Sequence, residues 1–425
     1  MYSHNRAVAC APCMAAAMLS LSAAACSGEA EEEHDGVAVG LLVPYTGELA
    51  AQGVNVERVM LVLEDAVNEA GGVAGKSVRI VAQDTHSDVG KGLASARRLA
   101  DDPSVLAFVG PDHDELIIAM QDEVLDPTWP HLVPGVTAEE LDTPPESHRF
   151  RLGPIAEELG CALAERMYDV GYRNIAVVYS EDRSSQAFSE SVEATLQHWD
   201  LVGRADVTRI AVSSAPASMN RALAELGSIA PDGVILATSA EVGAQVVHNW
   251  MLSPGSRTAD WFLAPSLLNR SFLANILPGG LEGAMGVAPA VANEPDADDL
   301  AELVEQRFAD QPFIGSYYYY DAAALAVLAI EAAAHVAGGV PTRAEVAEQV
   351  RRVARPPGER VHWDELPRAL EVIRSGGDVD YVGITGNLTL DENGDTEQRA
   401  MRYRQERIDG TNIVFEAYRV CVPVM

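Results

Sequence analysis

The sequence predicts an α/β protein in which strands and helices alternate and the strands form parallel sheets. Val37–Val43 is a Val- and Leu-rich run that is typical of a strand buried on both faces. From Gln52 the apolar residues recur every three or four positions, as on one face of a helix, and residues 78–82 supply a second strand. Such strand–helix–strand units are nearly always right-handed and parallel, and ligands bind beyond the carboxyl ends of their strands. We therefore expect a ligand near Tyr45, Thr46 and Gly47.

The same alternation continues along the chain in two halves, which the polar, Pro-rich segment 142–148 separates. Further strands are predicted at residues 105–109, 131–133, 175–179, 207–212, 233–237, 261–264, 281–286, 399–404 and 413–420. Helices are predicted at residues 91–100, 116–124, 155–170, 184–199, 217–229, 241–252, 300–308, 320–336, 344–353 and 366–373. Their apolar stripes are the expected core faces.

Length and charge narrow the possible functions. The chain has 425 residues, enough for two domains with cores of their own. Its formal net charge of −33 argues against nucleic-acid binding, which requires a basic face. The acidity serves solubility, with steering of cationic ligands as the alternative.

The N-terminus is predicted to be an export signal, residues 1–25. One early Arg6 precedes a run of small and apolar residues, and no acid occurs before Glu29. The segment before Cys26 resembles a bacterial lipobox, which implies a lipid-modified Cys26; an uncleaved membrane anchor is the alternative. Residues 26–36 are acidic and form an expected disordered tether. Outside the leader and its lipobox, Cys161 and Cys421 remain, either as a disulfide or as two buried thiols.

Val37 to Asp84 resembles the opening of the leucine/isoleucine/valine-binding family, the type I periplasmic binding proteins that serve ABC importers. Pro44-x-x-Gly47, the helix ending in Gly71-Gly72, and the segment from Tyr320-Asp321 carry the likeness, as do residues 381–395. The resemblance implies two Rossmann-like lobes joined by a three-crossing hinge. Lobe I is then expected at residues 37–147 and 265–380, and lobe II at 148–264 and 381–425. The crossings would fall near residues 148, 264 and 381.

The resemblance also implies a ligand site. Residues 134–141 resemble the family's Pro-Gly-Ala-Thr-x-Pro-Glu-Leu segment, so Val136 and Thr137 would hold a ligand carboxylate. Thr137 could equally cap a helix, with Glu140 completing a capping box. Residues 240–243 resemble the family's Ala-Glu-x-Gly, in which the carboxylate, here Glu241, receives the ligand ammonium. A surface carboxylate at a helix start is the alternative reading for Glu241.

Two departures from the family affect specificity. A Ser-rich loop is replaced by Asp112, His113, Asp114 and Glu115, which would repel a carboxylate and suit a cation. These acids also fit the first turn of a helix, where they complement the helix dipole. The family's Tyr-Gly is replaced by Ser185-Gln186, which removes an aromatic wall.

The sequence contains no pattern typical of an enzyme, cofactor site or metal site. Residues 391–395 resemble the start of an EF-hand calcium loop, but the twelfth position counted from Asp391 is Arg402 instead of the required Glu. We therefore expect a non-enzymatic, exported lipoprotein that binds an amino acid or a similar small polar solute and delivers it to the membrane subunits of an ABC importer. The alternatives are a receptor for a cationic amine and a ligand sensor without transport. The expected partners are the solute, the importer and, through Cys26, the membrane; no nucleic acid is expected.

Overall fold

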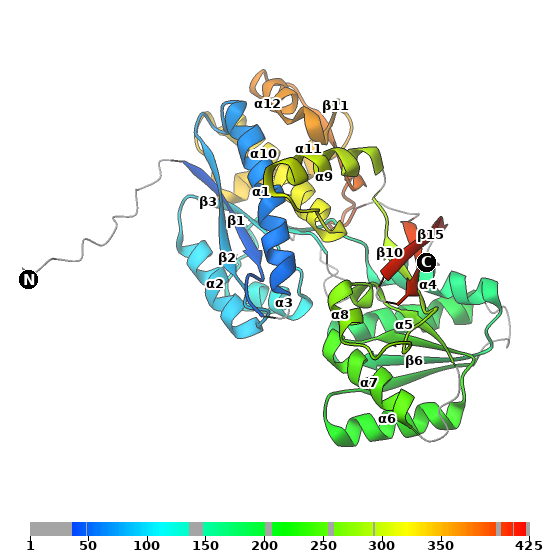
Figure 1. Cartoon of the computed structure of the whole chain (residues 1–425). Coiled ribbons are helices and arrows are strands. Elements are labelled where there is room, and N and C mark those ends of the chain that lie inside the picture. Colours follow the sequence, from blue (N-terminus) through cyan, green and yellow to red (C-terminus); the bar gives the residue numbers. More distant parts are fainter. Residues whose placement is uncertain are drawn as a thin grey trace, which may run out of the picture. The chain divides into compact units, whose positions relative to one another are not determined.

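The computed structural model describes residues 36–47, 49–135, 148–199, 206–253, 259–291, 294–396, 401–410 and 412–421. Its strands and helices alternate as the sequence predicts, and they build two main sheets and a small third one (Figure 1).

The first sheet is parallel, with the strand order β2-β1-β3-β4-β5. Its strands are β1 (Val37–Val43), β2 (Val78–Asp84), β3 (Val105–Val109), β4 (His131–Val133) and β5 (Arg149–Arg151). Helix α1 (Ala50–Glu69) and the long α10 (Ile314–Ala337) contribute to the core on one face, and α2 (Val89–Asp101) and α3 (Asp114–Glu123) to the core on the other. With both faces covered, β1 is fully buried along its length, which explains its unbroken apolar run.

The second sheet has the order β15-β14-β10-β9-β8-β6-β7. Its strands are β6 (Asn174–Ser180), β7 (Asp206–Val212), β8 (Gly233–Ala237), β9 (Asp260–Leu263), β10 (Met285–Pro289), β14 (Met401–Asp409) and β15 (Asn412–Cys421). Strand β14 runs antiparallel to both of its neighbours, β10 and β15, and the other neighbouring strands pair in parallel. Helices α4 (Ala156–Val170) and α5 (Arg183–Trp199) share one core cluster with this sheet. Helices α6 (Pro216–Ile229), α7 (Ala240–Leu252) and α8 (Arg270–Ala274) share another.

A third sheet, β11-β12-β13, lies with the helices of the first half. It comprises β11 (Glu359–His362), β12 (Val379–Gly383) and β13 (Gly386–Asn387), with α9 (Glu294–Phe308), α11 (Arg343–Val353), the 3-10 turn Trp363–Glu365 and α12 (Leu366–Arg374) around it. Strand β11 was not anticipated, nor were α8 and the 3-10 turn Pro265–Leu267 before it.

Helix α10 is the centre of the first lobe. It is long and apolar enough to cross a membrane by length and composition, but 83% of its most apolar window is buried against the protein. It therefore serves as a core helix. Its Asp321 is fully buried and accepts hydrogen bonds from the Tyr381 hydroxyl, the Ile384 amide, and both the amide and hydroxyl of Thr385.

The strand pairing corrects the expected positions of the crossings. Strand β5 pairs with β4, so residues 149–151 belong to the first sheet instead of opening the second. Strand β10 pairs with β9 and β14 and buries Val287 in the second core, so the chain stays with the second sheet well beyond residue 264. Tyr381 and Leu388 are buried in the first core, so the last crossing follows them. In each case, burial of an apolar side chain fixes the strand to its sheet.

The first and last crossing segments are bound to each other. Arg151 makes two hydrogen bonds of 2.8 Å to the carboxylate of Asp395, and its side chain is only 3% exposed. The Arg151 amide donates to the Gly394 carbonyl, and the Thr396 amide donates to the Arg151 carbonyl. These backbone bonds and the bidentate ion pair make the two segments one unit.

Candidate ligand-binding site

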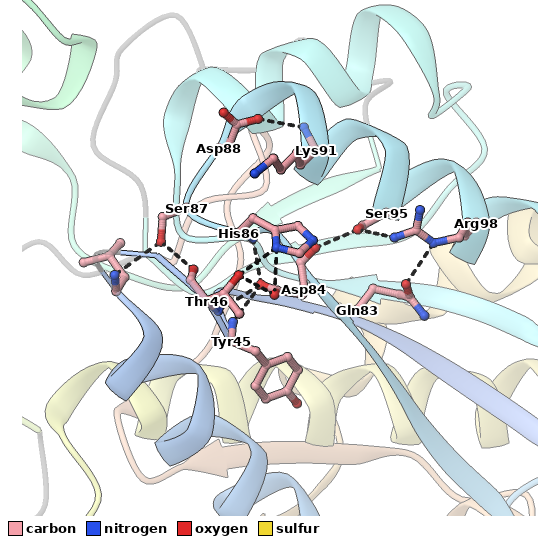
Figure 2. Close-up of polar contacts among 11 residues, drawn as sticks. Tyr45, Thr46, Gln83, Asp84, His86, Ser87, Asp88, Lys91, Ser95 and Arg98 are labelled. Carbon is pink, nitrogen blue, oxygen red and sulfur yellow. Dashed lines mark hydrogen bonds and ion pairs between the residues drawn. The ribbon is translucent and has the colours of Figure 1, made fainter.

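The carboxyl ends of β1 and β2 are joined by a network centred on Asp84, the last residue of β2 (Figure 2). Its Oδ1 accepts the backbone amides of Tyr45, Thr46 and His86 at 2.8, 3.2 and 2.7 Å. Its Oδ2 accepts the Thr46 hydroxyl at 2.7 Å and lies 3.0 Å from the imidazole of His86. Burial opposes the ionisation of Asp84, but the bonds from Thr46, His86 and Tyr45 outweigh it and hold the pKa of Asp84 below its usual value.

The network determines what this edge of the sheet can offer a ligand. Ser87 Oγ donates to the Thr46 carbonyl, and Gly47 has a left-handed φ of +92°. A Cβ on Gly47 would lie 2.7 Å from the His86 carbonyl, so the close approach of the two loops requires glycine. Because Asp84 already takes the amides of Tyr45 and Thr46, the loop after β1 does not present them to an anion. The Tyr45 side chain points away from the network (Figure 2), is half-buried, and has its pKa raised by burial and the charge of Glu57.

The acidic loop follows β3 at the same edge of the sheet. Asp112 is exposed to solvent on one side, and protein atoms crowd its carboxylate on the others. This crowding removes part of its hydration and, together with the charge of Asp114, raises the pKa of Asp112 to about 7. In the described ranges its carboxylate has no hydrogen-bond or ion-pair partner. Gly135, just after β4, lies so close that its Cβ would be 3.1 Å from Asp112 Oδ1.

Two rings close to the backbone of the acidic loop, those of His131 and Tyr319, carry no charge. His131 Nε2 bonds the Gly110 carbonyl at 2.8 Å, and burial lowers the pKa of His131 to about 4, so this imidazole carries no charge at neutral pH. Tyr319 is 3% exposed, and its hydroxyl lies against the backbone of Asp112. Gly110 has φ +77°, and a Cβ there would meet Tyr319 at 2.9 Å. Neither ring offsets the negative charge of Asp112.

Asp114 and Glu115 occupy the first turn of α3, as the helix-start alternative predicted, and they also contact α5. The buried Asp114 accepts the Ser184 hydroxyl at 2.6 Å, and Glu115 accepts the Arg183 amide at 3.1 Å. Glu115 thus places a carboxylate on the first amide of a helix, where the helix dipole favours negative charge.

The remaining predicted residues of the second lobe lie at helix starts. Ser185 is half-buried in the first turn of α5, and its amide is bound by Asp182 at 2.9 Å. Glu241 is exposed in the first turn of α7, directly after β8, and bonds Gln245 at 3.2 Å. Ser239 caps that helix by accepting the Val242 amide. Glu241 therefore presents an exposed carboxylate at the carboxyl edge of the second sheet.

Three predicted residues, Val136, Thr137 and Cys26, lie outside the described residues. Cys161 is buried and disulfide-bonded, so the thiol alternative for it is wrong. Helix α4, which carries it, contacts β15, which ends at Cys421. The side chain of Cys421 is not among those described, so its pairing with Cys161 stays a prediction.

Sequence reasoning missed two carboxylates of the first lobe that bind backbone amides of distant segments. Asp84 and Asp321 both lie in segments that resembled the family, and the available signal was an acid placed at the end of a strand or inside an apolar helix. A carboxylate in either position needs several donors, which here are backbone amides and hydroxyls from distant segments.

These features define a class of protein. Two α/β lobes carry polar side chains at the carboxyl edges of their sheets, where solutes bind, and among the described residues no cluster suits a metal ion. The chain belongs to the periplasmic binding protein family, which matches residues 36–358. The family is one of solute-binding proteins, exported to the periplasm, with the type I fold.

Relatives and solved structures agree with this assignment. The chain is 25% identical over 370 residues to the chemotactic signal transduction system substrate-binding protein BasB of Halobacterium salinarum, covering 83% of each chain. It is 24% identical over 306 residues to Leu/Ile/Val-binding protein homolog 1 of Brucella melitensis, covering 69% of this chain and 77% of that one. Its fold matches a leucine-binding protein, LivK, of Thermotoga maritima with a TM-score of 0.71 and 20% identity, over 91% of this chain and 99% of the other. A benzoate-bound solute-binding protein of R. palustris matches with a TM-score of 0.65 and 17% identity, over 91% and 97%.

Proposed function

We propose that this protein is an extracytoplasmic lipoprotein that binds an amino acid or an amino-acid-like solute and presents it to an ABC importer. The observation that carries the proposal is the family match combined with relatives that are themselves named for leucine, isoleucine and valine binding. Glu241 supports it, because an exposed carboxylate at the carboxyl edge of the second sheet can receive a ligand ammonium. Val136 and Thr137 are the proposed carboxylate site.

A thermal-shift screen of the purified chain against amino acids, amides and polyamines tests the proposal, since a ligand of the folded state stabilises it by mass action. Glu241→Gln then weakens an amino-acid ligand by about 1.5–3 kcal/mol, the usual range for a hydrogen bond to a charged group. Thr137→Val weakens the same ligand, whereas Thr137→Ser retains its affinity. Full affinity in Glu241→Gln, measured by calorimetry, rejects the ammonium role.

Asp112 favours a second candidate, a receptor for a cationic amine. Its carboxylate is open to solvent and unpaired in the described ranges, and its neighbour Asp114 adds negative charge. Asp112→Asn then weakens putrescine and strengthens a carboxylate ligand; a variant that alters neither affinity removes this candidate. Binding of a cation should also release protons near pH 7, because a bound positive charge lowers the raised pKa of Asp112. Calorimetry in buffers of different ionisation enthalpy measures that release.

A third candidate, a sensor without transport, is favoured by the likeness to BasB, which is named for chemotactic signal transduction. Uptake of labelled ligand by cells that lack this protein separates the two roles: a transport receptor is required for uptake, and a sensor is not.

The lipid anchor at Cys26, followed by the acidic tether, is part of the proposal. Cys26→Ser should release the protein from the membrane fraction into the soluble fraction. A variant that stays with the membrane would show that something other than this lipid holds it.

A further inference from the structure

A hollow of about 420 Å³ lies on the first lobe over the second half of α1. Its walls come from α1, α9, α10, the 3-10 turn Trp363–Glu365 and α12. A neighbouring hollow of about 380 Å³ shares Val62, Ala66, Glu69 and Leu303 with it. The volume of the first hollow falls within the range typical of small-molecule sites, about 300–1,000 Å³.

The hollow is separate from the candidate site described above. Helix α1 begins at the carboxyl end of β1 and runs back along the sheet. Near its end, Asn68 exchanges two hydrogen bonds of 2.8 Å with Val78, the first residue of β2. Glu69 and Ala70, which line the hollow, are therefore at the amino end of the strands, opposite the edge that carries Asp84 and Asp112.

The lining combines an apolar wall with negative charge. Val62, Ala66 and Ala70 of α1 face Leu366 and Pro367 of α12, and Leu303 of α9, which is 45% exposed, forms part of the rim. The two ionisable carboxylates of the lining are Glu69 and Asp364, and the lining includes no Lys, Arg or His. In the described part of the chain, neither carboxylate has a hydrogen bond or an ion pair.

Tyr320 supplies an independent sign that the hollow accommodates a polar group. Its side chain is only 2% exposed, it lines the hollow, and its hydroxyl makes no hydrogen bond within the described ranges. Its ring meets the Trp363 ring edge-on, with centroids 5.9 Å apart. The hydroxyl is not one of the described side-chain atoms that are both buried and unpaired, so it stays within reach of solvent and can exchange a hydrogen bond with a ligand in the hollow.

We propose that this hollow is a second binding site, on the first lobe, for a small organic cation with an apolar body. The ammonium group would lie between Glu69 and Asp364, within reach of the Tyr320 hydroxyl, and the apolar body against Val62, Ala66 and Leu366. Glu69 and Asp364 draw a cation electrostatically, and removal of the apolar body from water adds affinity that an inorganic ion would lack.

Calorimetric titration of the full chain with benzylammonium tests the proposal, with benzyl alcohol as the uncharged probe of the same shape. Benzylammonium should bind, and benzyl alcohol should bind about fivefold more weakly, which is the upper end of what a single exposed charge contact contributes. Glu69→Gln and Asp364→Asn should each weaken benzylammonium by a similar factor, and Tyr320→Phe should weaken it to a smaller extent.

Two controls assign the binding to this hollow. Asp122→Asn removes the same charge from an exposed position on α3 and should leave the affinity unchanged. Asp112→Asn shows whether benzylammonium binds instead at the candidate site on the other edge of the sheet. The proposal is overturned if benzylammonium gives no heat, if benzyl alcohol binds as tightly, or if Glu69→Gln with Asp364→Asn binds like wild type. If Asp112→Asn were the one variant that lost binding, benzylammonium would be binding at the candidate site, and the proposal would be overturned as well. None of these outcomes affects the thermal-shift test of amino-acid binding.

Discussion

Replacement of Asp321 by Asn should change how stability depends on pH. Asp321 is fully buried, and burial raises its pKa to about 6 from an ordinary value of 3.8, although hydrogen bonds from Thr385, Ile384 and Tyr381 oppose the rise. A carboxyl group with a raised pKa binds its proton more tightly in the folded state than in the unfolded state. Its favourable contribution is therefore complete below about pH 4 and is lost as the pH rises through 6.

The size of this loss follows from the pKa difference. A difference of about two units corresponds to roughly 3 kcal/mol of unfolding free energy between pH 3.5 and pH 7.5. Asn cannot titrate, so the wild type should lose about this much stability relative to Asp321→Asn over that interval. Asn also places an amide N–H against the Thr385 donors, which lowers the variant's stability at every pH without changing the slope.

Urea unfolding of both proteins at half-unit intervals of pH measures this difference. The other carboxylates of the chain also titrate, but they are common to both proteins and cancel in the comparison. A free-energy difference that stays constant from pH 3.5 to pH 7.5 would refute the reasoning, because Asp321 would then have the same pKa folded and unfolded. An opposite slope would mean that its hydrogen bonds outweigh its burial.

Three further predictions concern stability. Arg151→Met leaves the carboxylate of Asp395 without its bidentate partner and should lower the free energy of unfolding in urea by about 3–5 kcal/mol, the usual cost of breaking a buried ion pair. Arg151→Lys should lower it by less, and a loss below about 1 kcal/mol in Arg151→Met would contradict the importance of this pair. Reductant, or Cys161→Ser, should lower the melting temperature. Peptide mapping without reduction should recover the Cys161 peptide linked to the Cys421 peptide, whereas recovery of the Cys161 peptide alone would show that Cys161 is unbridged. Raising NaCl from 0.1 to 1 M should raise the melting temperature, because the screening length falls from about 10 to about 3 Å and the net charge of −33 repels itself less; a melting temperature that falls would mean that attractive pairs dominate.

The sequence was sufficient to predict the elements and the fold class. Strands β1, β3, β4 and β8 lie at the residues their apolar runs indicated, because a strand buried on both faces needs an unbroken apolar run. Most helices begin and end within a few residues of the predicted positions, since helix ends follow Gly, Pro and capping residues. These signals are local and can be read from one chain.

The crossings and the geometry of the site could not be read in this way. Strand β10 has the same apolar character whichever sheet it joins, and its membership depends on pairing with β14, more than 100 residues later. In the same way, a sequence places Asp84 at a strand end but does not say which amides it will bind. The donors of Tyr45 and Thr46 reach it only because β1 and β2 are neighbours in register, with Val43 opposite Asp84.

The Asp84 network has a consequence for ligand orientation. With the amides after β1 bound to Asp84, the loop there does not offer these backbone donors to a ligand, and the Tyr45 hydroxyl is buried. The next loop along the sheet adds Asp112, which has no hydrogen-bond or ion-pair partner in the described ranges, and His131, which bonds Gly110 before that loop, is uncharged. We therefore expect the described surface of the first lobe at this edge to favour the positive end of a solute. A zwitterionic ligand would then need its carboxylate donors from residues 136–137 or from the second lobe. Two variants test the two ends of such a ligand separately. Thr137→Val should weaken the binding of ligands that carry a carboxylate, and Asp112→Asn should weaken the binding of ligands that carry a positive charge.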